Sequence, residues 1–234
     1  MTATEALAEL ESKGTEQTRK IYLRHGVVEE MFGVSYGDLD KLAKVIRRQK
    51  ATEIADDLWE SQNHDAKVLA TKLFGDQPMT QAHANQLAKG VRHPLQSTGL
   101  AEVVAKQEYA PVLAEKWIVL SVTRSLWKVH LGWATVASIA VAKKPPRKVE
   151  NSWFHPMIET IESTIHDSPN DLRGQMNDSL IAIGSRDETL RDLALDAAKR
   201  IGVVDVDHGE TSCKTPDATA YIEKVWARKQ RSSS

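Results

Sequence analysis

The chain of 234 residues has little cysteine, few aromatic residues and no long apolar run. Its single cysteine, Cys213, excludes an internal disulfide and is typical of a reducing compartment. No apolar run reaches the roughly 18 residues that a membrane-spanning helix needs, and residues 1–5 are polar and lack the core of a signal peptide. We therefore expect a cytoplasmic protein with no membrane partner.

Helical periodicity dominates the chain, and no alternating strand of useful length is present. In segment 37–50, for example, Leu39, Leu42, Ala43 and Ile46 follow one another at the spacing of a single helix face. The pattern predicts a helix start at Thr15 and helices over 4–13, 37–50, 51–61, 64–74, 80–90, 97–107, 109–119, 123–142, 153–167, 170–183, 187–201 and 216–230. Short helices joined by short turns indicate an α-solenoid, all-α and forming a single domain over 1–234.

The charge is unevenly distributed, although the whole chain carries only −1. Residues 77–149 contain 10 Lys and Arg against 3 Asp and Glu, a net charge of +7, whereas both flanking regions are acidic. Such an excess either attracts phosphates or is a solvated helix face whose partners come from the acidic flanks. The composition leaves both interpretations open. The spacing of Trp59, Trp117, Trp127 and Trp133 favours core positions over base stacking.

Two segments interrupt the helical pattern. The first holds Pro145 and Pro146 between the cations Lys143, Lys144, Arg147 and Lys148, which form either a solubilising linker or a contact to a phosphate backbone. The second begins a turn-plus-helix extension at about residue 203. Its His208 and Cys213 are too few for a zinc site, so we expect no metal and no cofactor. Thr215 and Pro216 predict the start of the final helix.

Several stretches resemble a known family, the HEAT-repeat DNA alkylation-repair proteins of the AlkD glycosylase type. The resemblance covers residues from about 10 to 202 and is carried by Thr15 to Gly26, Met31-Phe32-Gly33-Val34, Leu58-Trp59-Glu60, Asn63 to Ala70, Glu115-Lys116-Trp117, Leu126-Trp127 and Leu180 to Gly184. It implies a right-handed superhelical α-solenoid of HEAT-like antiparallel helix pairs. It also implies a monomer that binds double-stranded DNA, with alkylated duplex as the substrate of the enzymes.

The resemblance also places the family's active-site positions. Thr98 stands where the family has its catalytic carboxylate and Pro94 where it has a tryptophan, while His130 replaces an arginine and Asp178 a second tryptophan. Tyr22 matches a retained tyrosine that, with the cations at 143–148, would contact DNA. A threonine hydroxyl can form hydrogen bonds but supplies no negative charge, so Asp178 would have to take over the carboxylate role or is simply solvated.

Two functions remain open from the sequence. One is an alkylpurine DNA glycosylase of weakened or lost activity, and the other is a scaffold without catalysis that binds DNA structures or a protein partner.

Overall fold

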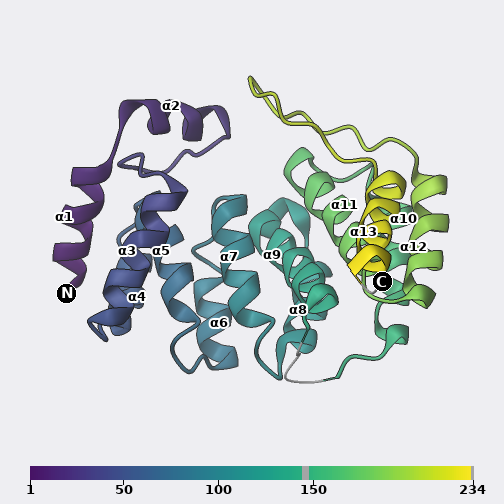
Figure 1. The fold of residues 1–234 in the computed structure, drawn as a ribbon, viewed down its shortest axis with the longest axis horizontal. Coiled ribbons are helices and arrows are strands. Elements are labelled where there is room, and N and C mark those ends of the chain that lie inside the picture. The colour runs from purple at the N-terminus through teal and green to yellow at the C-terminus, as the bar shows by residue number, and fades with distance from the viewer. Residues whose placement is uncertain (144–147, 233–234) are drawn as a thin grey trace. The chain divides into compact units, whose positions relative to one another are not determined.

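The computed structural model describes residues 1–143 and 148–232, and their only regular secondary structure is helical, without a strand (Figure 1). No helix in this part of the chain is long and apolar enough to cross a bilayer. The predicted all-α class is therefore confirmed. Of the four cations in the first break of the helical pattern, Lys144 and Arg147 lie outside the described residues.

The chain divides into two compact units. The first comprises Met1–Val104 with Gly209–Thr211, and the second comprises Ala105–His208 with Ser212–Ser234. The single domain over residues 1–234 stays a prediction. The elements of the first unit are α1 (Ala3–Lys13), α2 (Glu16–Arg24), α3 (Tyr36–Arg48), the 3-10 helix η1 (Thr52–Ile54), α4 (Ala55–Glu60), α5 (His64–Phe74), α6 (Gln81–Leu87) and α7 (Pro94–Val104).

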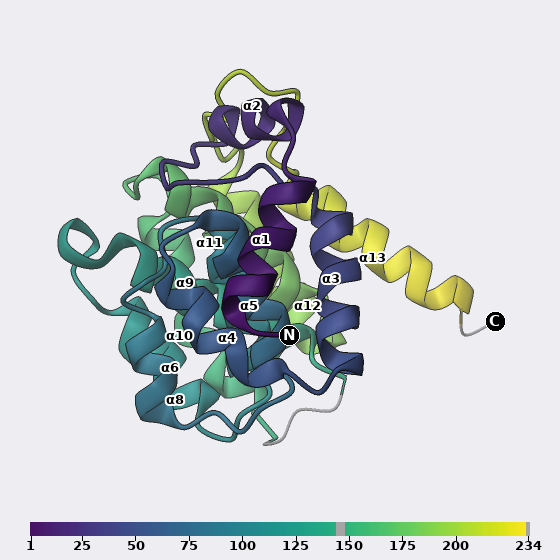
Figure 2. The ribbon, with the colours of Figure 1, turned by 90° about the vertical axis from the view of Figure 1, so that its left-hand side faces the viewer.

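Helix α5 lies at the centre of the first unit, where α3, α4 and α7 pack against it, and α1 packs against α4 and α5 (Figures 1 and 2). Its residues are almost all buried, including the polar His64, Asp65 and Lys67. Asn63 caps its start, because the Asn63 side chain accepts a hydrogen bond from the Ala66 N–H at 3.1 Å. In both views α2 lies beyond the ends of α1 and α3.

Two elements of the first unit show how far the pattern specifies local structure. The predicted stripe of α3 is confirmed, since Leu39, Leu42, Ala43 and Ile46 are all buried. Helix α7, in contrast, begins at Pro94 rather than at residue 97. His93 explains the difference: its Nδ1 accepts the Leu95 N–H at 3.2 Å, which caps the helix and leaves Pro94 at the first position, where proline is favoured.

The second unit is built around α9, which packs against both α8 and α11. Its φ/ψ angles leave the helical region at Ser125, which kinks the helix. Trp117 and Trp133 are buried here, as Trp59 is in the first unit, which confirms these three tryptophans as core. The elements are α8 (Ala110–Ile118), α9 (Val122–Val141), the 3-10 helix η2 (Asn151–Trp153), α10 (His155–Thr164), α11 (Asn170–Gly184), α12 (Glu188–Ile201) and α13 (Ala218–Ser232).

The C-terminal helix α13 packs against α11 and α12. Its start differs from the predicted one at Thr215 and Pro216, because Asp217 carries the cap: its side chain accepts the Ala220 N–H at 2.7 Å. Ile222 of this helix is fully buried beside Gly184, where an added Cβ would lie 2.7 Å from the Ile222 Cδ1. The predicted extension thus includes a helix whose apolar face is part of the second unit's core.

Candidate nucleic-acid interface

Two stretches that carry the family resemblance meet in the first unit through Asp65. The Asp65 carboxylate accepts three backbone hydrogen bonds, from the N–H groups of Phe32 at 2.7 Å, Gly33 at 3.0 Å and Val34 at 2.9 Å. Gly33 permits this turn because its φ is +82° and an added Cβ would lie 2.7 Å from the Thr15 carbonyl oxygen. The segment that follows α2 is therefore held onto the start of α5.

A buried ion pair joins the same two regions. The Lys67 side chain is fully buried, and its Nζ lies 2.6 Å from the Glu29 Oε1 and 3.0 Å from the Gly90 carbonyl oxygen. Burial alone would raise the pKa of the Glu29 carboxyl, but the neighbouring His64, Lys67 and Gln96 outweigh it and lower the pKa to about 2. Glu29 is consequently ionised at any physiological pH.

Two histidines complete this buried group. Gln96 donates from its Nε2 to the His64 Nδ1 at 3.2 Å and to Glu29, while its Oε1 accepts the Arg92 N–H at 2.9 Å. The His64 and His93 rings meet edge to face with centroids 4.9 Å apart. Burial lowers the pKa of His93 to about 4, so the ring is neutral and its Nε2 donates to the His25 carbonyl oxygen at 3.1 Å.

Tyr22, the retained tyrosine, belongs to the same group. Its ring is only 8% exposed and packs edge to face against His64 at 5.1 Å, and its hydroxyl donates to the Val34 carbonyl oxygen at 2.7 Å. Burial raises the pKa of Tyr22 to about 12. We call the six residues the polar anchor: Tyr22, Glu29, His64, Lys67, His93 and Gln96. Tyr22 thus uses its hydroxyl inside the protein, and a contact from it to DNA stays a prediction.

The sequence did not predict that the six residues of the polar anchor lie together. Glu29 is separated from Lys67 by 38 positions and from Gln96 by 67. A lysine on a helix is usually solvated, so Lys67 attracts attention only because it lies within the apolar run that continues to Ala70.

The positions that the resemblance assigns to catalysis are distributed over both units. In the first unit, Thr98 is exposed in the second turn of α7, and Pro94 begins that helix half-buried. In the second unit, His130 is buried in α9 beside Trp127, with ring centroids 5.6 Å apart. Asp178 is exposed on α11, which packs against α9. The atoms around its carboxyl still desolvate it and raise its pKa to about 6.

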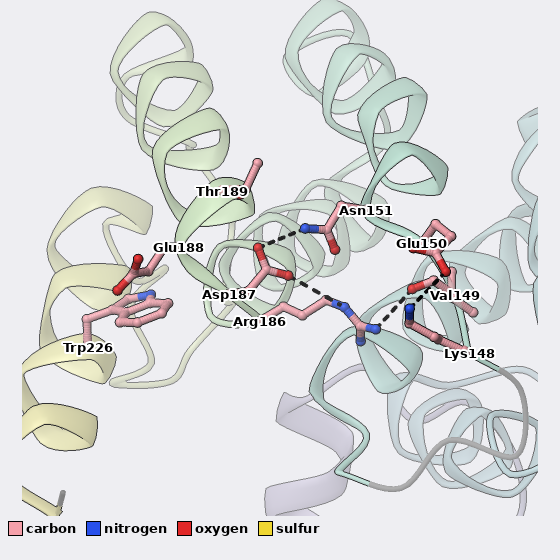
Figure 3. A pocket seen from close by; sticks show the side chains of 9 residues that line it. All are labelled: Lys148, Val149, Glu150, Asn151, Arg186, Asp187, Glu188, Thr189 and Trp226. Atoms are coloured by element: carbon pink, nitrogen blue, oxygen red, sulfur yellow. Dashed lines mark hydrogen bonds and ion pairs between the residues drawn. The ribbon is translucent and has the colours of Figure 1, made fainter.

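A hollow of about 830 Å³ in the second unit contains Lys148, one of the predicted DNA contacts (Figure 3). Arg186 also lines it, but its guanidinium is engaged with the carbonyl oxygens of Ile139, Ala140 and Val149 at 3.1–3.2 Å. The carboxylates of Glu150, Asp187 and Glu188 face the same space, and Lys148 lies 3.2 Å from Glu150. With three carboxylates against two cations, the lining of this hollow carries no excess of positive charge.

The connector between α12 and α13 holds the remaining candidates. His208 Nε2 lies 3.0 Å from the Thr215 hydroxyl, and Cys213 is exposed. Within the described residues, no three His, Cys, Asp or Glu side chains gather to hold a metal ion.

Residues 6–222 match the family model described as DNA alkylation repair enzyme. The chain belongs to this family. Two similar relatives are uncharacterized proteins of Listeria, Lin0241 of L. innocua at 31% identity and Lmo0209 of L. monocytogenes at 30%, each match covering 93% of this chain and 94% of the relative.

A solved structure is also similar, with a TM-score of 0.81 and 26% sequence identity over 98% of this chain and 95% of the other. It is described as representing a new family of proteins related to the HEAT-like repeat DNA glycosylases, with affinity for branched DNA structures. The similarity confirms the predicted HEAT-like architecture for this member of the DNA alkylation repair family.

Proposed function

We propose that this protein binds DNA as a monomer and prefers branched DNA to a continuous duplex. The observation that carries the proposal is the similarity, over nearly the full length of both chains, to a solved protein with affinity for branched DNA. Binding of this kind needs a surface that contacts phosphates and holds the shape of a junction, and it needs no catalytic group.

Exposed cations support phosphate contacts despite the near-neutral whole chain. Lys and Arg residues on the surface of the basic middle third include Lys89, Arg92, Lys106, Lys116, Arg124, Lys143 and Lys148. Each cation that neutralises a phosphate releases a counterion, so the affinity would fall as salt rises. Within this proposal, Lys143, Lys144, Arg147 and Lys148 contact the backbone without distinguishing one DNA shape from another.

The residues at the family's active-site positions support binding over excision. A glycosidic bond that breaks builds positive charge on the deoxyribose, and a carboxylate stabilises that charge. Thr98 has only a hydroxyl at the position that the resemblance assigns to the carboxylate, and the buried His130 replaces a permanent cation by a titratable ring.

Asp178 favours a second candidate, an alkylpurine DNA glycosylase. The residue is exposed as a whole, but desolvation of its carboxyl raises the pKa to about 6, close to neutral pH, which is suitable for moving a proton or positioning a water. The match to the DNA alkylation repair family supports the same activity. In this alternative Asp178 supplies the charge that Thr98 cannot.

Two assays on one preparation separate the candidates. Fluorescence anisotropy over a salt series compares a four-way junction with a linear duplex of the same sequence, and free base is measured after incubation with duplex containing 7-methylguanine. We expect tighter binding to the junction and no release of base. Equal affinity for both DNAs would refute the preference for branches. Release that is lost in Asp178→Asn would establish the glycosylase instead, and gain of release in Thr98→Asp would confirm the position of the missing carboxylate.

A further inference from the structure

The turn that ends α2 exposes two aliphatic side chains. Leu23 is 60% exposed and Val28 is 87% exposed, whereas Val27 between them is 2% exposed and packs inward. Exposed aliphatic side chains occur singly on most proteins, but these two flank one tight turn. We call residues Leu23 to Val28 the α2 turn.

The backbone of the α2 turn has the hydrogen bonds of a Schellman motif. The Val27 N–H donates to the Tyr22 carbonyl oxygen at 3.0 Å and the Gly26 N–H to that of Leu23 at 3.0 Å, with Gly26 at φ +80°. The motif directs Val27 toward Tyr22 and leaves Leu23 and Val28 exposed. An added Cβ at Gly26 would meet nothing within 4 Å, whereas one at Gly209 would lie 3.3 Å from the Arg24 carbonyl oxygen, so the connector approaches the turn at Arg24 and leaves Gly26 open.

The polar anchor holds the α2 turn from both ends. His93 donates to the His25 carbonyl oxygen, and the Tyr22 hydroxyl donates to the Val34 carbonyl oxygen. Beyond the turn, Glu29 follows Val28 directly and is fixed by Lys67 at 2.6 Å. An apolar pair on a support of this kind loses little conformational entropy when it binds.

Exposed cations lie beside the pair on α2. Lys20 and Arg24 lie one helical turn apart on α2, and Arg19 adds a third cation on the same helix. Glu16 lies 4.0 Å from Lys20 at the exposed start of the helix, Glu29 is committed to Lys67, and Glu30 is exposed beyond the turn. The cations of α2 and the aliphatic pair together match a polyanion that also presents apolar surface.

We propose that the α2 turn is a wedge that packs Leu23 and Val28 against the open base pairs at a DNA branch point, while Lys20 and Arg24 contact the flanking phosphates. Aliphatic wedges stack on bases where a duplex is unstacked, and a branch point offers such bases without the cost of opening a helix. A continuous duplex offers only phosphates to the same turn. The wedge rests on the proposed function, and it would explain why the protein prefers branched DNA to a continuous duplex.

The test compares wild type with Leu23→Ser/Val28→Ser. The matched control is Val112→Ser/Val119→Ser, which removes a pair of valines 48% and 79% exposed on and just after α8. Anisotropy measures affinity for a four-way junction and for the linear duplex, and 2-aminopurine placed beside the branch point reports, by a change in its fluorescence, that a side chain packs against the open base. Circular dichroism shows whether each variant is folded.

We expect the wedge variant to lose at least about tenfold in junction affinity, to retain its duplex affinity and to lose the 2-aminopurine signal, because burying an exposed Leu or Val side chain is worth about a factor of ten or more. The control should match wild type in all three. A junction preference that survives in the wedge variant overturns the wedge and leaves the proposed function standing. A wild type without junction preference overturns both. Sedimentation of wild type with anionic vesicles, abolished in the wedge variant while junction binding is unchanged, would assign the turn to a lipid surface instead.

Discussion

Replacing Lys67 by methionine should destabilise the first unit strongly. Lys67→Met keeps most of the volume of the side chain but removes the cation that lies 2.6 Å from Glu29 and 3.0 Å from the Gly90 carbonyl oxygen. The Glu29 side chain is 10% exposed, so its charge would lose its partner without gaining much water. Breaking a buried pair from one side costs about 3–5 kcal/mol.

A double-mutant cycle distinguishes the pair from simple packing. Glu29→Gln alone leaves the ammonium group of Lys67 buried and unpaired and should also cost several kcal/mol. Glu29→Gln/Lys67→Met removes both charges, so we expect it to be less destabilised than the sum of the single variants by about 2 kcal/mol or more. Unfolding free energies come from urea titrations followed by circular dichroism. Trp59, whose ring centroid lies 5.7 Å from the Lys67 amine, provides a local fluorescence probe.

The control for this cycle is an exposed lysine. Lys41 pairs with Asp38 at 2.8 Å, but its side chain is 76% exposed, so Lys41→Met should change stability by less than about 0.5 kcal/mol. If Lys67→Met costs no more than Lys41→Met, or if the two single effects at Glu29 and Lys67 simply add, the buried pair does not stabilise the unit as argued.

Three further outcomes follow from particular residues. Burial holds the pKa of His93 in the folded protein at about 4, below its usual 6.5, so the unfolded chain takes up the proton first as the pH falls. The free energy of unfolding should therefore drop by about 3 kcal/mol between pH 6.5 and 4. In urea titrations, His93→Gln should lack the contribution of this histidine to the drop. Gly33→Ala should lower the melting temperature far more than Gly26→Ala: both glycines have φ near +80°, but only at position 33 would the new Cβ lie 2.7 Å from a carbonyl oxygen. Equal decreases in the melting temperature would show that the positive φ alone determines the cost of each substitution. The last change replaces four cations by alanine: Lys143, Lys144, Arg147 and Lys148. It should weaken junction and duplex binding alike and flatten the salt dependence of affinity, measured by anisotropy. Unchanged affinity would make the segment a linker.

The sequence predicted those parts of the fold that local rules decide. The apolar stripe of α3 and the span of α5 follow from periodicity and from caps such as Asn63. The predicted start of α7 was wrong by three residues, because the cap of this helix is the ring nitrogen of His93 and histidine is not among the usual N-cap residues. Local patterns carry no information on contacts such as Glu29 to Gln96, which depend on how α2, α5 and α7 pack.

The candidate site was harder to predict than the fold, because the residues that carry the family resemblance are mainly structural ones. The most recognisable of these residues, among them Tyr22, Gly33, Asp65 and Lys67, lie together and hold the α2 turn to the first unit. They build a support, which identifies the family without specifying its chemistry. A change at Thr98, which is exposed on α7, would leave the contacts of that support untouched. Under the proposed function, catalytic groups would therefore change while the α2 turn keeps its place, and DNA binding would persist without excision.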